Sequence, residues 1–174
     1  RDRSVSRGLG DVYKRQDFIG LRGLSFVCNA AYIYSRVRFE EGAPERDRPL
    51  AGQSPYLVKA GFFYQYDDKG ISASLLYNRI GKRIESVGVP MQNQNEDIPD
   101  IYEMPRNSLD LTFSKKIGKI VEIKAGIQDM LNSKVEYKQF VKLTDDKGGK
   151  SEREQLIRSY RPGVDINIGV SLRF

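Results

Sequence analysis

Histidine and tryptophan are absent from this chain of 174 residues, and cysteine occurs once. A single cysteine excludes a disulfide framework and a cysteine-based zinc site, and the lack of histidine removes the commonest general base and metal ligand. No apolar run reaches the length of a transmembrane helix, but a membrane-spanning β-strand alternates in polarity and needs no such run. The net charge of +6 is mild and scattered, so nucleic acid is not an expected partner.

The first residues differ in character from the rest. Residues 6–16 read SRGLGDVYKRQ, which resembles the translation of a transposase-based sequencing-library adapter. We therefore interpret residues 1–16 as adapter read-through, expect them to be unstructured, and assign the fold to residues 17–174. The alternative is a native basic N-terminal arm or targeting segment, although this stretch lacks the apolar core of a signal peptide. On the adapter interpretation, residues 17–174 begin inside a longer coding sequence.

The rest of the chain alternates apolar and polar residues with period two, interrupted by turns and long polar segments. The alternating segments are 24–35, 56–66, 71–78, 109–114, 121–128 and 164–174. Short connections at 67–70 and 118–119 alternate with long ones at 40–54, 85–107 and 132–163. The sequence therefore predicts an all-β antiparallel fold of about six strands. We expect an open, curved sheet, because six strands supply too little circumference for a large closed barrel.

The alternation alone fits both a soluble barrel, with its apolar face inward, and a transmembrane β-barrel, with that face toward lipid. Long loops at one end only, and tyrosines near the strand ends, favour the transmembrane form. Cys28 falls on the apolar face, as a small hydrophobic side chain. The charged and amide side chains expected toward the lumen are Lys59, Glu122, Lys124, Gln128 and Arg173.

The final residues follow the pattern polar–x–Gly–x–x–apolar–x–aromatic. The pattern positions are Asn167, Gly169, Leu172 and Phe174. This pattern resembles the signal by which the assembly machinery of bacterial outer-membrane barrels recognises its substrates. It requires an exposed β-edge with one apolar face, and a glycine that permits close backbone approach. An ordinary last strand that ends in phenylalanine is the alternative interpretation.

Several segments carry a family resemblance in order and spacing. They are RPLAGQSPY at 48–56, LYNRIGKRI at 76–84, YEMPR at 102–106, IQDMLN at 127–132 and YRPG at 160–163. They resemble the C-terminal part of the β-barrel of TonB-dependent outer-membrane receptors of the Bacteroidetes type. The family's barrel has about 22 strands around a plugged lumen, so this chain would supply roughly a quarter of it.

The resemblance implies a location in the outer membrane of a Gram-negative cell and energy-coupled import of a nutrient. The implied partners are outer-membrane lipid, the barrel-assembly machinery and, through a plug region outside this sequence, the TonB complex. A surface lipoprotein that caps the barrel stays open at this point. No cofactor, metal or catalytic residue is expected, and the chain is not expected to be an enzyme.

Two other classes stay open from the sequence: a different outer-membrane barrel, either a porin-like channel or a barrel enzyme, and a soluble β-barrel binding module. The sequence matches no complete motif for binding phosphate or calcium. Gly149, Lys150 and Ser151 resemble the end of a phosphate loop but lack its first glycine and its strand–helix context. The spacing of Asp97, Asp100 and Glu103 fits no defined calcium loop.

Overall fold

The structure, a computed structural model, describes residues 3–15, 23–40, 47–89, 98–144 and 150–173, and consists of two antiparallel sheets. The seven-stranded sheet contains, in spatial order, β1 (Arg3–Arg15), β2 (Leu24–Arg36), β3 (Tyr56–Tyr66), β4 (Ile71–Ile80), β7 (Arg106–Ile117), β8 (Val121–Gln128) and β11 (Asp165–Leu172). The four-stranded sheet contains β10 (Lys150–Tyr160), β9 (Val135–Thr144), β6 (Ile101–Glu103) and β5 (Arg83–Ser86). The prediction of an all-β, antiparallel and open fold is confirmed.

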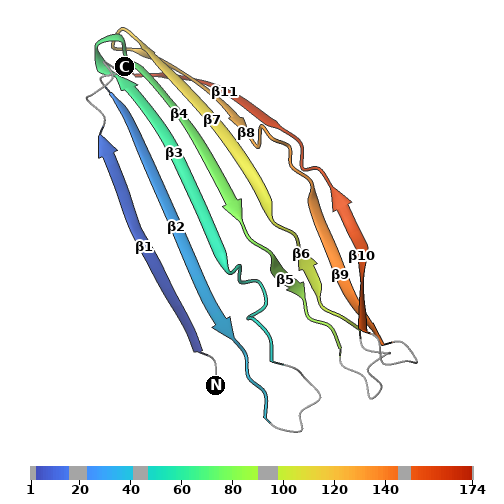
Figure 1. Ribbon diagram of the computed structural model, residues 1–174. Helices are drawn as coiled ribbons and strands as arrows, with labels where there is room; N and C mark the ends of the chain where they lie inside the picture. The colour runs from blue at the N-terminus through green and yellow to red at the C-terminus, as the bar shows by residue number, and fades with distance from the viewer. Residues whose placement is uncertain (1–2, 16–22, 41–46, 90–97, 145–149, 174) are drawn as a thin grey trace.

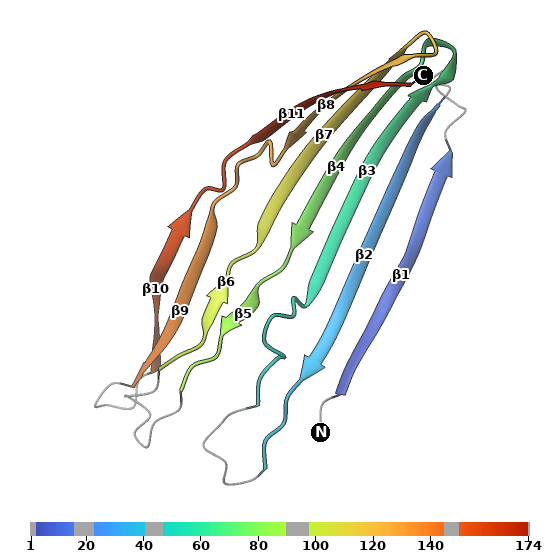
Figure 2. The same cartoon turned by 180° about the vertical axis from the view of Figure 1, so that it is seen from behind.

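The six strands expected from alternation are β2, β3, β4, β7, β8 and β11 of the seven-stranded sheet. Each pairs with its neighbour in an up-and-down order, so the sheet is a meander with β1 and β11 at its edges. Its curvature and its two separate edges are visible in Figures 1 and 2. The two edge strands do not pair with each other, so the sheet does not close into a barrel.

Short turns gather at one end of the seven-stranded sheet (Figure 1). One is the 3-10 turn η2 (Asp67–Lys69), which ends at Gly70 with φ 57°. The next has Gly118 with φ 61°, and both glycines occupy the left-handed region that favours this residue. The end of β11 lies at this same end of the molecule, and the four-stranded sheet lies at the opposite end (Figure 2).

The four-stranded sheet corrects two of the predicted loops. Within 132–163, expected as loop, β9 and β10 form a hairpin with Val135 opposite Tyr160. Within 85–107 lie β6 and the end of β5, which pair with each other, and an isolated bridge joins Val89 to Ile98. In β9 the alternation of apolar and polar residues is interrupted at Gln139 and Phe140, and β10 is mostly polar on both sides, so the period-two signal is weaker here than in the six predicted strands. The expectation of long structureless loops is therefore wrong for the described parts of these two regions.

The chain passes between the two sheets at irregular joints. Between β4 and β5, a Cβ added to the buried Gly81 would lie 2.7 Å from Cε1 of Tyr56, so only glycine lets this ring lie against the backbone. Between β8 and β9, Asp129 and Asn132 adopt positive φ values of 51° and 43°, which asparagine and aspartate tolerate best among residues with a Cβ. The Asp129 carboxylate pairs with Arg106, and its backbone N–H donates to Oδ1 of Asp110 at 2.8 Å. These contacts fix the joint against β7.

The first strand was not expected. Residues 3–15 form β1, whose backbone pairs with β2 from Arg3 opposite Arg36 to Arg15 opposite Ser25. The unpaired N–H and C=O groups of an edge strand accept any extended segment, because the pairing uses backbone rather than side chains. The expectation of an unstructured segment is therefore wrong for residues 3–15. Their interpretation as adapter sequence stays a prediction.

Candidate functional site

An apolar band crosses one face of the seven-stranded sheet. Directly opposed residues on neighbouring strands share a face, and one row of them is apolar across six strands. The row consists of Phe26, Phe62, Leu75, Leu111, Ile127 and Ile166. The rings of Phe26 and Phe62 touch, with centroids 4.8 Å apart, yet Phe62 remains 48% exposed and Ile166 68%. In the described part of the chain, no second layer covers this band.

Tyrosines border the band at both ends. β3 begins at Tyr56 and ends at Tyr66, and the even spacing between them places both on the face of Phe62. At the end near the four-stranded sheet, Tyr32 lies opposite Tyr56. There the Tyr77 hydroxyl donates to Oδ1 of Asn107 at 2.9 Å. The band is therefore bounded along the strand by side chains that have an apolar ring and a polar tip.

The opposite face of the seven-stranded sheet is polar. The hydroxyls of Ser72 and Ser114 lie 2.7 Å apart, and those of Ser74 and Thr112 also form a hydrogen bond. Lys59 lies between Asn29 and Asn78 on this face. Glu122 and Lys124 also lie on it, in rows with Lys116 and Ser114, as the alternation predicts.

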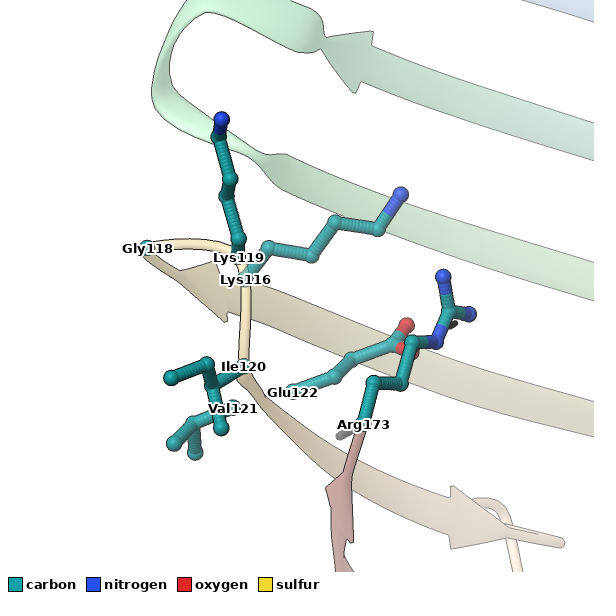
Figure 3. A pocket seen from close by; sticks show the side chains of 7 residues that line it. All are labelled: Lys116, Gly118, Lys119, Ile120, Val121, Glu122 and Arg173. Atoms are coloured by element: carbon teal, nitrogen blue, oxygen red, sulfur yellow. Dashed lines mark ion pairs between the residues drawn. The ribbon is translucent and has the colours of Figure 1, made fainter.

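A shallow pocket lies at the short-turn end of the polar face (Figure 3). Its lining residues are Lys116, Gly118, Lys119, Ile120, Val121, Glu122 and Arg173. One carboxylate oxygen of Glu122 lies 3.7 Å from Nη2 of Arg173 and 3.7 Å from Nζ of Lys124. Arg173 and Lys124 therefore approach a carboxylate of the same chain, whereas Lys116 and Lys119 form no ion pair among the described residues.

The four-stranded sheet holds the buried apolar side chains of the described residues, which are Ile84, Val135 and Tyr137. Lys82, at the joint that leads into this sheet, places Nζ 4.0 Å from the ring centroid of Tyr102 and 3.7 Å from that of Phe140. A cation over two aromatic faces is held by their electrostatic attraction. Partial burial lowers the pKa of Lys82, and the negative charges of Glu152 and Glu154 oppose that shift.

Ion pairs join the strands of the four-stranded sheet. Arg83 donates to Oε2 of Glu103 from Nε at 2.9 Å and from Nη2 at 2.7 Å. Nζ of Lys138 lies 2.6 Å from Oε1 of Glu154 and 3.5 Å from Oε2 of Glu136. The hydrogen bond to Glu154 raises the pKa of Lys138. Sequence reasoning missed Arg83–Glu103 and Lys138–Glu154 because each joins two strands and depends on their register, whereas Glu136 and Lys138 lie two residues apart on β9.

The residues of the predicted assembly signal lie on β11 as far as they are described, and Phe174 lies outside the described residues. Asn167 stands opposite Gly126, where a Cβ would come within 2.6 Å of its Oδ1, so this glycine leaves room for the amide. A Cβ on Gly169 would meet nothing within 4 Å. Leu172 is exposed opposite Val121. The role of these residues as an assembly signal stays a prediction.

The residues weighed as small-ligand sites have other partners or lie outside the described chain. Asp97 and Gly149 lie outside it, and Lys150 and Ser151 begin strand β10. Oδ1 of Asp100 accepts from the Gly88 N–H at 2.8 Å, and Glu103 is occupied by Arg83. Among the residues that the structure describes, no cluster of three or more His, Cys, Asp or Glu side chains could hold a metal ion.

In the described ranges, no helix has the length and apolar character needed to cross a membrane. Comparison with protein-family models, with curated proteins and with solved structures finds no match to this chain.

Proposed function

We propose that residues 17–174 form the C-terminal part of the β-barrel of a TonB-dependent outer-membrane receptor that imports a nutrient. The observation that carries the proposal is the exposed, tyrosine-bordered apolar band on a sheet whose other face is polar. A lipid phase would cover the band, and a water-filled or plugged lumen would hydrate the other face. Each face then meets the solvent that its side chains require.

The height of the band supports a membrane position. Tyr56 and Tyr66 are the two ends of the 11-residue strand β3, which spans about 33 Å between them at about 3.3 Å per residue step. Strands of transmembrane barrels tilt by about 40°, and this tilt reduces the distance to a height of about 25 Å. That value equals the usual height of the apolar band between the aromatic girdles of an outer-membrane barrel, about 25 Å.

The two ends of the sheet support the same orientation. Short turns connect the strands at one end, as on the periplasmic side of such barrels. At the other end the strands continue into the four-stranded sheet, whose side chains are paired with one another as water-exposed hairpins require. In the proposed orientation this sheet forms the base of the outer loops.

The family resemblance favours a receptor over another outer-membrane barrel. The segments that carry it coincide with the joints between the two sheets: 76–84 spans the passage from β4 to β5, 102–106 that from β6 to β7, and 127–132 the end of β8. The exposed band argues against a soluble binding module, because such a module would need a cover over Phe62 and Ile168, and the described chain supplies none.

In the proposed mechanism, ligand binds the outer loops and a plug domain, and energy delivered through TonB rearranges the plug to open a path. The segment described here would contribute a rigid wall, part of the lumen surface and the base of the outer loops. No residue of this wall would perform covalent chemistry.

The reading frame upstream of residue 17 in the genomic locus tests the proposal. We expect it to encode a plug domain in place of SRGLGDVYKRQ, and we expect the full-length product to fractionate with outer membranes and to require detergent for extraction. A locus without a plug domain contradicts the receptor. A product that stays in the aqueous fraction contradicts any membrane barrel.

A further inference from the structure

We propose that the short-turn rim of the apolar band, formed by Tyr64, Tyr66, Lys69 and Lys115, binds the phosphate of a phospholipid headgroup. This inference rests on the proposed membrane position of the band and adds a lipid-binding site to it. The rim is distinct from the pocket around Glu122, which lies on the opposite face of the sheet.

Lys115 is the one charged residue in an otherwise apolar and aromatic row. The register places Tyr66 opposite Ile71, Ile71 opposite Lys115, and Lys115 opposite Ile123, which itself lies opposite Val170. The lysine stem is therefore on the face of the band, half-buried. Its Nζ donates to the backbone carbonyl of Lys69 in the turn. A stem along apolar surface with its charge at the edge is the snorkelling arrangement typical of membrane interfaces.

Lys69 brings a second ammonium group to the same turn. Its Nζ lies 5.5 Å from the ring centroid of Tyr66. Among the described residues, neither Lys69 nor Lys115 forms an ion pair with a carboxylate. The neighbouring Asp67 accepts a hydrogen bond from Nε2 of Gln65 at 2.7 Å. Asp68 belongs to the same turn and, among the described residues, forms no ion pair with either lysine, so both ammonium groups keep free donors for an external anion.

The polar face carries cations at the same end of the sheet. There Nη2 of Arg173 lies 3.7 Å from a carboxylate oxygen of Glu122 (Figure 3), and Nζ of Lys124 lies 3.7 Å from the same oxygen. Lys116 and Lys119, which line the pocket of Figure 3, form no ion pair among the described residues, so the band face differs in placing its two lysines beside a tyrosine ring and an apolar row.

A lipid headgroup fits this rim better than free phosphate. Two ammonium groups offer donors to phosphate oxygens, and the rings of Tyr64 and Tyr66 suit the level of the headgroups. The acyl chains of a bound lipid would lie along the band and supply apolar contacts that a free ion lacks. The proposed ligand is therefore a phospholipid whose phosphate is reached from the apolar side of the sheet.

Native mass spectrometry of the detergent-solubilised full-length gene product, titrated with phosphatidylglycerol, tests this site. The test variant is Lys69→Gln with Lys115→Gln, and the matched control is Lys59→Gln with Lys124→Gln, which removes the same charge from the polar face. We expect phosphatidylglycerol to bind the test variant about tenfold more weakly than the wild type, because each surface lysine adds to the attraction of an anionic headgroup. The control should retain wild-type binding, and inorganic phosphate should not displace the lipid.

Equal weakening in both variants, no weakening in the test variant, or displacement by inorganic phosphate would overturn the site. Insertion of the wild type into phosphatidylcholine vesicles, measured by protease protection, separates this inference from the function it rests on. Insertion without a lysine-dependent preference for phosphatidylglycerol contradicts the rim alone. Failure to insert contradicts both the rim and the membrane barrel.

Discussion

The seven-stranded sheet leaves large apolar side chains uncovered across one face, with Ile168 76% exposed, whereas the four-stranded sheet contains the three buried apolar side chains of the described residues. The four-stranded sheet also pairs its charges, through Arg83 with Glu103 and Lys138 with Glu154. One sheet therefore covers part of its apolar surface and pairs charges by itself, although Leu156 and Ile157 on its edge strand β10 stay exposed. The other needs an apolar phase or partner to cover about one full face.

This difference separates two ways in which the same chain can be stabilised. Burial in the four-stranded sheet is intramolecular and should persist in water. Burial of the band would come from lipid in the proposed function, so its contribution should depend on the surroundings of the protein. Substitutions in the two sheets should therefore respond differently to the presence of a bilayer.

The largest effect is expected from a charge at the middle of the band. Leu111→Arg should lower the free energy of unfolding in a bilayer by about 2–4 kcal/mol, the cost of arginine near the midplane on the lipid face. Urea unfolding of the full-length product in vesicles measures this. The control Thr112→Arg places the same charge on the polar face, and equal losses for the two variants would remove the distinction between the faces.

A cavity in the four-stranded sheet should cause the next largest loss of stability. Ile84 is 1% exposed, so Ile84→Ala should destabilise the local structure by about 2 kcal/mol, toward the lower end for such truncations because a small sheet relaxes easily. Hydrogen exchange should rise in β5, β6 and β9 while β3 and β4 stay protected. The exposed Val87→Ala serves as the control, and an equal response from it would contradict the small core around Ile84.

Removal of the Arg83–Glu103 ion pair should lower the free energy of unfolding by less than the Ile84 cavity does. Glu103→Gln keeps the shape of the side chain and removes its charge, so we expect a loss of about 0.5–1 kcal/mol for this partly exposed pair. A double-mutant cycle with Arg83→Gln, at low and high salt, isolates the coupling. A coupling near zero at low salt would show that the pair adds nothing to the four-stranded sheet.

The smallest expected effect concerns lysine protonation in the four-stranded sheet. The pKa of Lys82 is lowered, chiefly by burial, and the pKa of Lys138 is raised by its hydrogen bond to Glu154. Only a neutral amine is acylated, so as pH rises Lys82 should reach half-maximal labelling at a lower pH than Lys138. Peptide mapping after brief acylation over a pH series gives both midpoints, and the reverse order would contradict the two environments.

For Lys82, the lowered pKa means that the folded chain binds fewer protons than the unfolded chain between the two pKa values. Its contribution to the free energy of unfolding should therefore increase as pH rises through that window. For Lys138, whose pKa is raised, the stabilising contribution should be lost as pH rises through the folded pKa.

The strands of the band were predictable because each alternates in polarity between two different surroundings. The bounds of β3 and the turn before Gly70 follow directly from that alternation and from the turn sequence Asp67–Gly70. The face of each residue follows as well, since one residue of register shift would move Phe62 or Leu111 to the polar side.

The four-stranded sheet was not predictable in the same way. Its hairpins have polar and aromatic residues on both faces, and their pairing follows from the strands they continue rather than from their own sequence. The contacts of Lys82 and of Arg83 join residues about 20 or more positions apart, and no local pattern encodes such a register. β1 was not predicted either, because backbone pairing at the edge of a sheet does not need a matching side-chain pattern.

The central claim is that lipid covers the band, and Cys28 offers the most direct measurement. This cysteine is native to the chain and lies opposite Ala60 on the face of the band. The full-length product, with any other cysteines replaced, would carry a fluorophore on Cys28 and be reconstituted in vesicles that contain brominated lipid. In the control, Cys28→Ser is combined with Val27→Cys, which moves the fluorophore to the polar face opposite Gly61. The account predicts strong quenching from position 28 and little from position 27; equal quenching at both positions, or none at position 28, would contradict it.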